Sequence, residues 1–277
     1  MENSLYEGVL LFTIFSVMGW ICESIWCSIG EGKVVNRGFL SGPYCPIYGF
    51  GGLLILAICL PLQAWPPLVF VMALVSASIL EYFTGWLLET LFHTRWWDYS
   101  KRFLNIKGRV CLRNSVLFGL MGIAVTYFVY PPLSRLLGDI PLAVQRGLSI
   151  GIALVFAADL THTVVVLTGL QKRLRGLHEA IHELERYNEA YSWFDLKDLD
   201  GSIERLRAIC EADSGNGTAA AILERLDALT KRNVTSARLL RAFPGSTHKD
   251  LPEELNALRD AWRKRIAARR DKDAGAE

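Results

Sequence analysis

Four carboxylates lie within long apolar segments of the sequence, where a charged side chain is costly. They are Glu23, Glu81, Glu89 and Asp159. An aspartate at the centre of a membrane-spanning helix costs roughly 2.5 to 3.5 kcal/mol on insertion scales, so such acids are candidates for a functional site. His162 follows Asp159 by one helical turn, a spacing that allows a hydrogen bond between them. These five side chains could line one polar pathway for a substrate or an ion.

A structural role for the same acids is the alternative. Acids near the inner ends of membrane helices can extend to the interface or pair with arginines as clamps. The candidate partners are Arg37, Arg95 and Arg109. Trp97 and Asp98 follow Arg95 and complete the expected group of polar and anchoring residues at the cytoplasmic face.

A stretch rich in glycine and proline precedes and enters the second apolar segment. Its defining residues are Gly42, Pro43, Pro46, Gly49 and Gly51. This composition predicts non-helical backbone near membrane depth, which is tolerated only inside protein or against a water-filled cavity. Broken helices of this kind form binding sites in transporters. Close helix packing through small residues is the alternative explanation of the glycines.

The apolar segments that must position these residues predict an all-α, polytopic membrane protein. A spanning helix needs about 20 mostly apolar residues. Five stretches meet or approach this length, at residues 5–29, 44–62, 67–92, 112–130 and 148–170. Loops and span ends on one side carry eleven Lys and Arg residues, and those on the other side carry two, Arg135 and Arg146. The positive-inside rule therefore predicts a multi-pass protein of the cytoplasmic membrane, with its N-terminus outside and its C-terminus in the cytoplasm.

Charge divides the chain into two parts near residue 171. Of 30 Lys and Arg and 28 Asp and Glu residues, only 10 and 9 lie within residues 1–170. We therefore expect a transmembrane domain over residues 1–170 and a cytoplasmic helical tail over residues 171–277. Each part has a net charge close to zero, which argues against a nucleic-acid partner.

The tail begins with a heptad-like pattern. Its seam comprises Leu174, Leu177, Ile181, Leu184, Asn188 and Tyr191. The alternating spacings of three and four predict a coiled coil, which could join copies of the chain into a homo-oligomer. His178 and His182 match an HExxH pattern, but the helix is highly charged and no third ligand follows, so we expect no metal site.

An internal repeat relates the first and third apolar segments. Residues 19–26 match residues 85–92, which aligns Glu23 with Glu89, and a basic loop and a glycine-bearing helix follow each copy. The repeat predicts a duplicated helix hairpin with a fifth helix added. A chance match between two apolar segments is the alternative.

Several motifs in the first 170 residues resemble those of one known family. They are Gly19-Trp20-x-x-Glu23-Ser24, residues 36–51 (NRGFLSGPYCPIYGFG), Glu81-Tyr82, residues 95–100 (RWWDYS) and residues 108–112 (GRVCL). Together they are similar to the signature of the bacterial ABC-transporter type IV permease family, over about residues 5 to 170. The resemblance implies a small multi-helix membrane protein of the permease class and implies no particular substrate.

The function expected from sequence is therefore a membrane permease subunit in the lipid bilayer. A nucleotide-binding loop of the GxxxxGK[ST] type is absent from the sequence, so any role driven by ATP needs a separate ATPase subunit. Nothing in the sequence is typical of an activated nucleophile, and we expect neither an enzyme activity nor a cofactor. A non-transport scaffold or regulator that acts through its cytoplasmic tail is the alternative.

Overall fold

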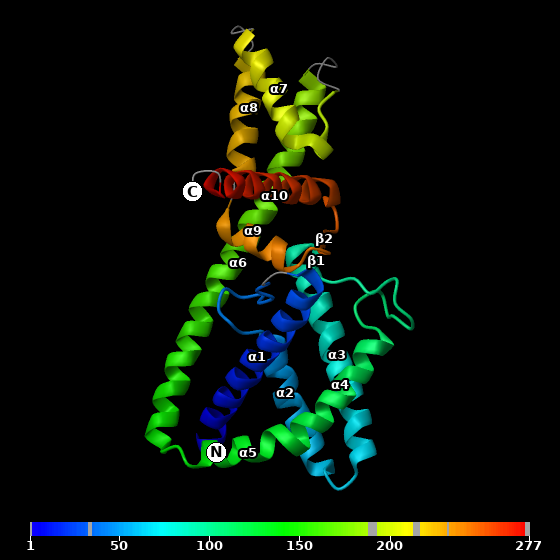
Figure 1. The fold of residues 1–277 in the computed structure, drawn as a ribbon, viewed down its shortest axis with the longest axis vertical. Coiled ribbons are helices and arrows are strands. Elements are labelled where there is room, and N and C mark those ends of the chain that lie inside the picture. The colour runs from blue at the N-terminus through cyan, green and yellow to red at the C-terminus, as the bar shows by residue number, and fades with distance from the viewer. Residues whose placement is uncertain (1, 33–34, 188–192, 213–216, 232, 275–277) are drawn as a thin grey trace. The chain divides into compact units, whose positions relative to one another are not determined.

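The structure of the chain, a computed structural model, describes residues 2–32, 35–187, 193–212, 217–231 and 233–274. Helices form most of these residues, as expected for the all-α class (Figure 1). In chain order they are α1 (Glu2–Glu31), α2 (Pro46–Cys59), α3 (Pro66–Phe92), α4 (Leu112–Ala124), α5 (Tyr130–Gly138), α6 (Leu142–Tyr187), α7 (Leu199–Ala212), α8 (Gly217–Thr230), α9 (Val234–Ala242) and α10 (Pro252–Ala274). Two short strands, β1 (Thr94–Arg95) and β2 (Thr247–His248), pair antiparallel.

The chain divides into two compact units. The first comprises Met1–Leu91, Trp96–Val164 and Ala242–Gly245. The second comprises Phe92–Arg95, Val165–Arg241 and Ser246–Glu277. Each unit has its own buried apolar clusters, and each is described separately below.

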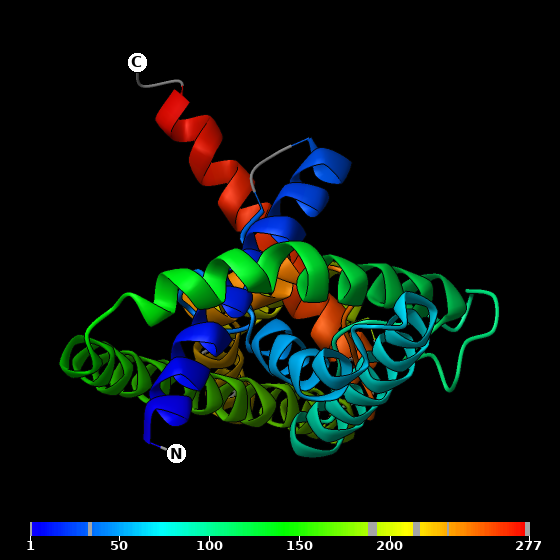
Figure 2. The same cartoon turned by 90° about the horizontal axis from the view of Figure 1, so that it is seen from below.

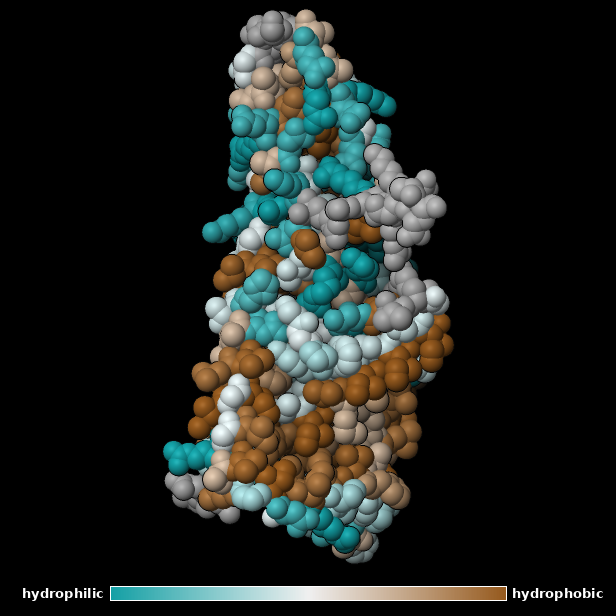
Figure 3. All heavy atoms as spheres, turned by 60° about the vertical axis from the view of Figure 1, so that its left-hand side comes forward, coloured by the Kyte–Doolittle hydropathy of each residue, from teal (hydrophilic) through white to brown (hydrophobic). Residues whose placement is uncertain are grey.

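Within the described residues, four helical segments are long and apolar enough to cross a membrane. They are Leu5–Ile29, Pro66–Phe92, Leu112–Gly138 and Leu142–Arg186. Many of their large apolar side chains are exposed, and Figure 3 shows apolar residues gathered over the surface of these helices. Exposure of this kind is costly in water and favourable in lipid, so the chain is a membrane protein. Of the five predicted spans, the second corresponds to a shorter apolar helix, Pro46–Leu62.

The helix that begins with α4 continues through two prolines. Residues Val125–Val129 form a π-helical segment between α4 and α5, and Pro131 and Pro132 lie at the start of α5. The π-helical segment changes the backbone hydrogen-bond pattern just before the prolines, so the helix can continue although neither proline donates an N–H. The predicted end of this span at residue 130 is therefore wrong, and the helix runs to Gly138.

Glycines in the first unit allow close helix packing. α2 lies beside α1 (Figures 1 and 2). A Cβ on Gly49 would lie 2.3 Å from Ser16 Oγ, and one on Gly52 would lie 2.3 Å from the ring of Phe15. Gly51 has room by the same measure, since its nearest neighbour there would be Leu80 at 3.7 Å. Close helix packing therefore explains Gly49 and Gly52 but not Gly51. The predicted non-helical backbone ends at Cys45, because α2 is a regular helix from Pro46 onward.

The seam predicted for a coiled coil is buried within the second unit. Leu177, Ile181 and Leu184 of α6 share an apolar cluster with side chains of α7, α8 and α10. Leu174 belongs to a second cluster, around Trp262 of α10. The described part of the seam is therefore the core of a helical bundle formed by one chain, which corrects the predicted coiled coil. Asn188 and Tyr191 lie outside the described residues.

Candidate functional site

Glu23 of α1 lies between a tyrosine and an arginine in the first unit. The Tyr48 hydroxyl donates to Glu23 Oε1 at 2.6 Å, and Arg37 Nε lies 3.7 Å from Glu23 Oε2. Arg37 also donates to the carbonyl of Ala242 and stacks over the Phe243 ring, 4.6 Å from its centroid. This arginine is therefore fixed by several contacts, and its ion pair with Glu23 is a loose one.

Glu81 of α3 is the most deeply buried of the four predicted acids, with 7% of the residue exposed. Its Oε1 accepts a hydrogen bond from the Tyr99 hydroxyl at 3.3 Å. Within the described residues, its buried Oε2 has no hydrogen-bond partner. Glu23 is close enough to act on Glu81 electrostatically, so the two acids share one polar cluster.

Tyr99 and Cys45 line this cluster from the loops. Burial and the neighbouring Glu81 and Glu23 carboxylates raise the pKa of Tyr99 well above its usual range. The Tyr99 hydroxyl therefore keeps its proton and acts as a donor. Cys45 is buried, with 7% of the residue exposed, and its thiol donates weakly to the Arg37 carbonyl at 3.9 Å, which fits a packing role.

Glu89 of α3 forms a close ion pair with Arg109. Arg109 Nη2 lies 2.7 Å and Nε 3.2 Å from Glu89 Oε2, and each of the two side chains is only 13% exposed. Arg109 Nη1 also donates to the Tyr82 hydroxyl at 3.3 Å. Burial works to lower the pKa of Arg109, but the Glu89 carboxylate outweighs it and the pKa is raised. The Trp97 indole donates to the Arg109 carbonyl at 2.9 Å, which fixes the loop at this point.

Asp159 of α6 binds the backbone of the non-helical stretch before α2. Its Oδ1 accepts the Ser41 N–H at 3.0 Å, and its Oδ2 accepts the Gly42 N–H at 2.8 Å and the Tyr44 hydroxyl at 2.6 Å. On its own helix, Thr163 donates to Oδ1 at 3.4 Å. Several hydrogen-bond donors stabilise a charged carboxylate, and here they fix the non-helical stretch to α6.

The remaining predicted residues are placed apart from these acids. His162 is exposed. Among the described residues, the partners of the Asp159 carboxylate are Thr163 and the loop before α2. The predicted hydrogen bond between Asp159 and His162 is therefore wrong. Asp98 accepts the Ser100 N–H at 2.9 Å in an exposed turn. Arg95 lies in β1, where its backbone pairs with Thr247 of the second unit. Pro43 belongs to the non-helical stretch, and Pro46 begins α2.

The structure therefore brings together two of the acids, Glu23 and Glu81, and gives Glu89 and Asp159 separate partners. The sequence did not single out the tyrosines around the acids. Tyr44, Tyr48 and Tyr99 donate to Asp159, Glu23 and Glu81, and Tyr82 accepts a hydrogen bond from Arg109, the partner of Glu89. All four lie within the motif stretches, so tyrosine hydroxyls in those stretches were the available signal.

An all-α fold with long exposed apolar helices and buried acids paired to tyrosine and arginine defines a polytopic membrane protein. Residues 10–164 match the family described as "Putative ABC-transporter type IV", and the chain belongs to this family. The matched range contains all four acids and ends within α6. Neither a curated protein nor a solved structure matches the chain significantly.

Proposed function

We propose that the protein is the membrane permease subunit of an ABC-type transporter, with the polar cluster around Glu81 and Glu23 as its substrate or ion pathway. One observation carries this proposal: Glu81 is buried within an apolar span and one of its oxygens has no partner among the described residues. An unpaired buried acceptor costs about 1 to 3 kcal/mol, and more when it is charged. Such a group is retained where a ligand, cation or proton supplies the missing partner.

The topology of this subunit is part of the proposal. It has five spans, with α2 as the short one, an external N-terminus and a cytoplasmic tail in the bacterial inner membrane. The uneven distribution of Lys and Arg supports this orientation, because only Arg135 and Arg146 lie at the opposite ends of the spans.

A separate ATPase would drive the transport cycle. The family to which the chain belongs supports this part of the proposal, and the sequence itself lacks a nucleotide-binding loop of the GxxxxGK[ST] type. Purification of the tagged full-length protein in a mild detergent, followed by mass spectrometry, tests the partner. We expect a stoichiometric subunit that carries such a loop. If a control ABC complex survives the same procedure and no ATPase is retained here, the proposal fails.

The substitution Glu81→Gln tests the polar cluster itself. Glutamine has nearly the same shape but cannot carry charge, so we expect an inserted, correctly folded protein that has lost transport-coupled ATP hydrolysis. Asp139→Asn is the matched control, because Asp139 is exposed at the end of α5 and belongs to none of the proposed sites. Full activity in the Glu81→Gln variant would show that the cluster is not the pathway.

A scaffold or regulator that acts through the tail is the second candidate. It is favoured by the second unit, which has an apolar core of its own in which Trp262 is only 1% exposed. This candidate predicts that deletion of residues 171–277 abolishes function while Glu81→Gln does not. The permease proposal predicts that the truncated protein still inserts and retains substrate binding.

A further inference from the structure

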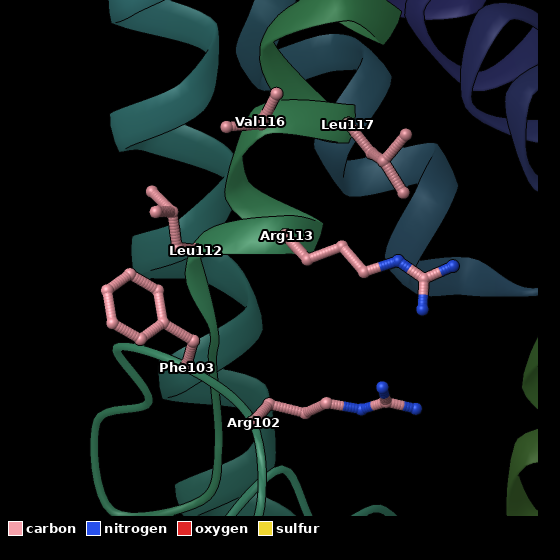
Figure 4. A pocket seen from close by; sticks show the side chains of 6 residues that line it. All are labelled: Arg102, Phe103, Leu112, Arg113, Val116 and Leu117. Atoms are coloured by element: carbon pink, nitrogen blue, oxygen red, sulfur yellow. The ribbon is translucent and has the colours of Figure 1, made fainter.

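A hollow of about 490 Å³ lies where the loop of residues 96–111 enters α4. Its lining residues are Arg102, Phe103, Leu112, Arg113, Val116 and Leu117. Figure 4 shows the Arg102 and Arg113 side chains extended in the same direction, with their guanidinium groups on the same side of the hollow. The hollow therefore combines two cations with apolar walls.

The two arginines are available for a ligand. Within the part of the chain that the structure describes, neither side chain has a hydrogen bond or an ion pair, and both residues are exposed. Arg37 and Arg109, in contrast, are each held by an acid and by further contacts. Two neighbouring guanidinium groups without a counterion attract an anion, and their planar donors match the oxygens of a phosphate group.

The apolar walls continue the surface of a spanning helix. Leu112, Val116 and Leu117 are 40%, 37% and 47% exposed, and they lie on the first two turns of the segment Leu112–Gly138. Leu112 and Val116 are four residues apart and so share one helical face. An occupant of the hollow can thus contact charge at one end and hydrocarbon at the other.

The loop beside the hollow has the character of a membrane interface. Phe103, Leu104 and Ile106 are 76%, 62% and 58% exposed, in a loop that also carries Lys101 and Lys107. Large exposed apolar side chains between basic residues are typical of a segment that lies among lipid headgroups. This position favours a lipid over a soluble anion, because a soluble anion would leave the apolar side chains and walls uncovered.

We infer that this hollow binds an anionic phospholipid, with its phosphate on Arg102 and Arg113 and an acyl chain along Leu112, Val116 and Leu117. The lipid would also hold the loop that carries Tyr99 and Arg109, the partners of Glu81 and Glu89. The inference depends on the membrane location of the chain and is independent of the proposed transport activity.

Native mass spectrometry of the full-length protein in a mild detergent tests the inference. The protein is titrated with phosphatidylglycerol, with phosphatidylcholine of the same acyl chains, and with inorganic phosphate. We expect phosphatidylglycerol to bind more tightly than phosphatidylcholine. In the Arg102→Gln/Arg113→Gln variant its binding should weaken by about 25-fold, because each basic residue near a lipid headgroup contributes about fivefold.

Two further variants separate charge at this site from charge in general. Arg135→Gln/Arg146→Gln removes the same charge from exposed positions at the other ends of the spans, and it should leave lipid binding unchanged. Arg102→Lys/Arg113→Lys keeps both charges but loses the planar donors, so it should bind more weakly than the unmodified protein and more tightly than the glutamine variant. Binding by this variant also shows that the site tolerates substitution. Equal binding of the two lipids, or an equal loss in the Arg135/Arg146 control, would overturn the inference. So would complete competition by inorganic phosphate, since the site would then recognise the free anion.

Discussion

The Arg109 guanidinium contacts the Glu89 carboxylate through two N–H groups, with Nη2 at 2.7 Å and Nε at 3.2 Å from the same oxygen. A looser version of this pair joins Arg37 and Glu23, at 3.7 Å. In both cases the acid lies near the end of a long apolar helix and the arginine lies in the loop that follows. Glu23 and Glu89 are also the positions that the internal sequence repeat aligns.

The helices that follow the two pairs begin in the same way. Cys45 and Cys111 precede the first residues of α2 and α4, and both have extended backbone. They are separated by the same offset in sequence as Glu23 and Glu89. In each copy, glycines then allow close contact with the preceding helix: Gly49 against Ser16, and Gly122 against Ala73. The duplication of a helix hairpin would require these correspondences, and it stays a prediction until the two hairpins are superposed.

The difference between the two ion pairs gives the first prediction. Glu89→Gln leaves the Arg109 charge without its counterion at a site where both side chains are 13% exposed. We expect a loss of about 3 kcal/mol in the free energy of unfolding, as for other broken buried pairs. Glu23→Gln should cost less than about 1 kcal/mol, because the pair is partly exposed and glutamine can still accept from Tyr48. Thermal unfolding in detergent checks both variants, and equal losses would contradict the distinction.

Much of the fold could be predicted from hydropathy, because a span must supply enough apolar residues whatever it packs against. The heptad spacing from Leu174 to Leu184 correctly predicted a buried helical stripe. It could not identify what buries that stripe, since α7, α8 and α10 satisfy the same pattern as a second chain would. The prolines at positions 131 and 132 misled the prediction because a preceding π-helical segment, which allowed the helix to continue, has no simple sequence pattern.

The candidate site was predictable only in part, for a related reason. The cost of a charge in lipid identified the acids from the sequence, and the arginines of the motif loops were natural partners. The choice of partner depends on tertiary position, however. Asp159 binds Ser41, which is 118 residues distant, and not His162 on its own helix. Spacing along one helix cannot predict contacts of that kind.

The Asp159 contacts give the second prediction. Asp159→Asn replaces one acceptor oxygen by an NH2 group, which then faces donors of the loop at Ser41, Gly42 and Tyr44. A hydrogen bond to a charged group contributes about 1.5 to 3 kcal/mol, so the loop should open more often. Hydrogen exchange measured by mass spectrometry should show lost protection over residues 38–45. The same measurement on His162→Asn, one turn away and exposed, should show no change.

The third prediction concerns pH and the second unit. His248 Nδ1 accepts the N–H groups of Asp250 and Leu251 at 3.2 and 3.1 Å, at the start of α10, and this requires an unprotonated Nδ1. Burial lowers the pKa of His248 below its ordinary value. The unfolded chain then takes up a proton at a higher pH than the folded chain. The stabilisation is therefore complete above about pH 6.5 and is lost as the pH falls through the folded-state pKa.

Hydrogen exchange of α10 in the full-length protein checks this pH dependence. After correction for the intrinsic exchange rate, protection of α10 should be lower at about pH 5.5 than at about pH 7.5. His248→Asn removes the titrating group and should flatten this dependence. His182→Asn alters a histidine whose side chain is 54% exposed, and it should leave the dependence in place. A dependence that persists unchanged in His248→Asn would exclude His248 as its source.

The fourth prediction separates an intramolecular core from a coiled coil between chains. Leu184 lies on the heptad seam and has no exposed surface, because side chains of the same chain cover it. Leu184→Ala should lower the free energy of unfolding of the second unit by about 2 to 5 kcal/mol, as expected for a cavity in a packed core. The molecular mass measured by light scattering should stay the same, because the seam joins no second chain. Glu224→Ala, at an exposed position of α8 in the same unit, should change neither quantity. A fall in mass caused by Leu184→Ala alone would show that the seam pairs two chains.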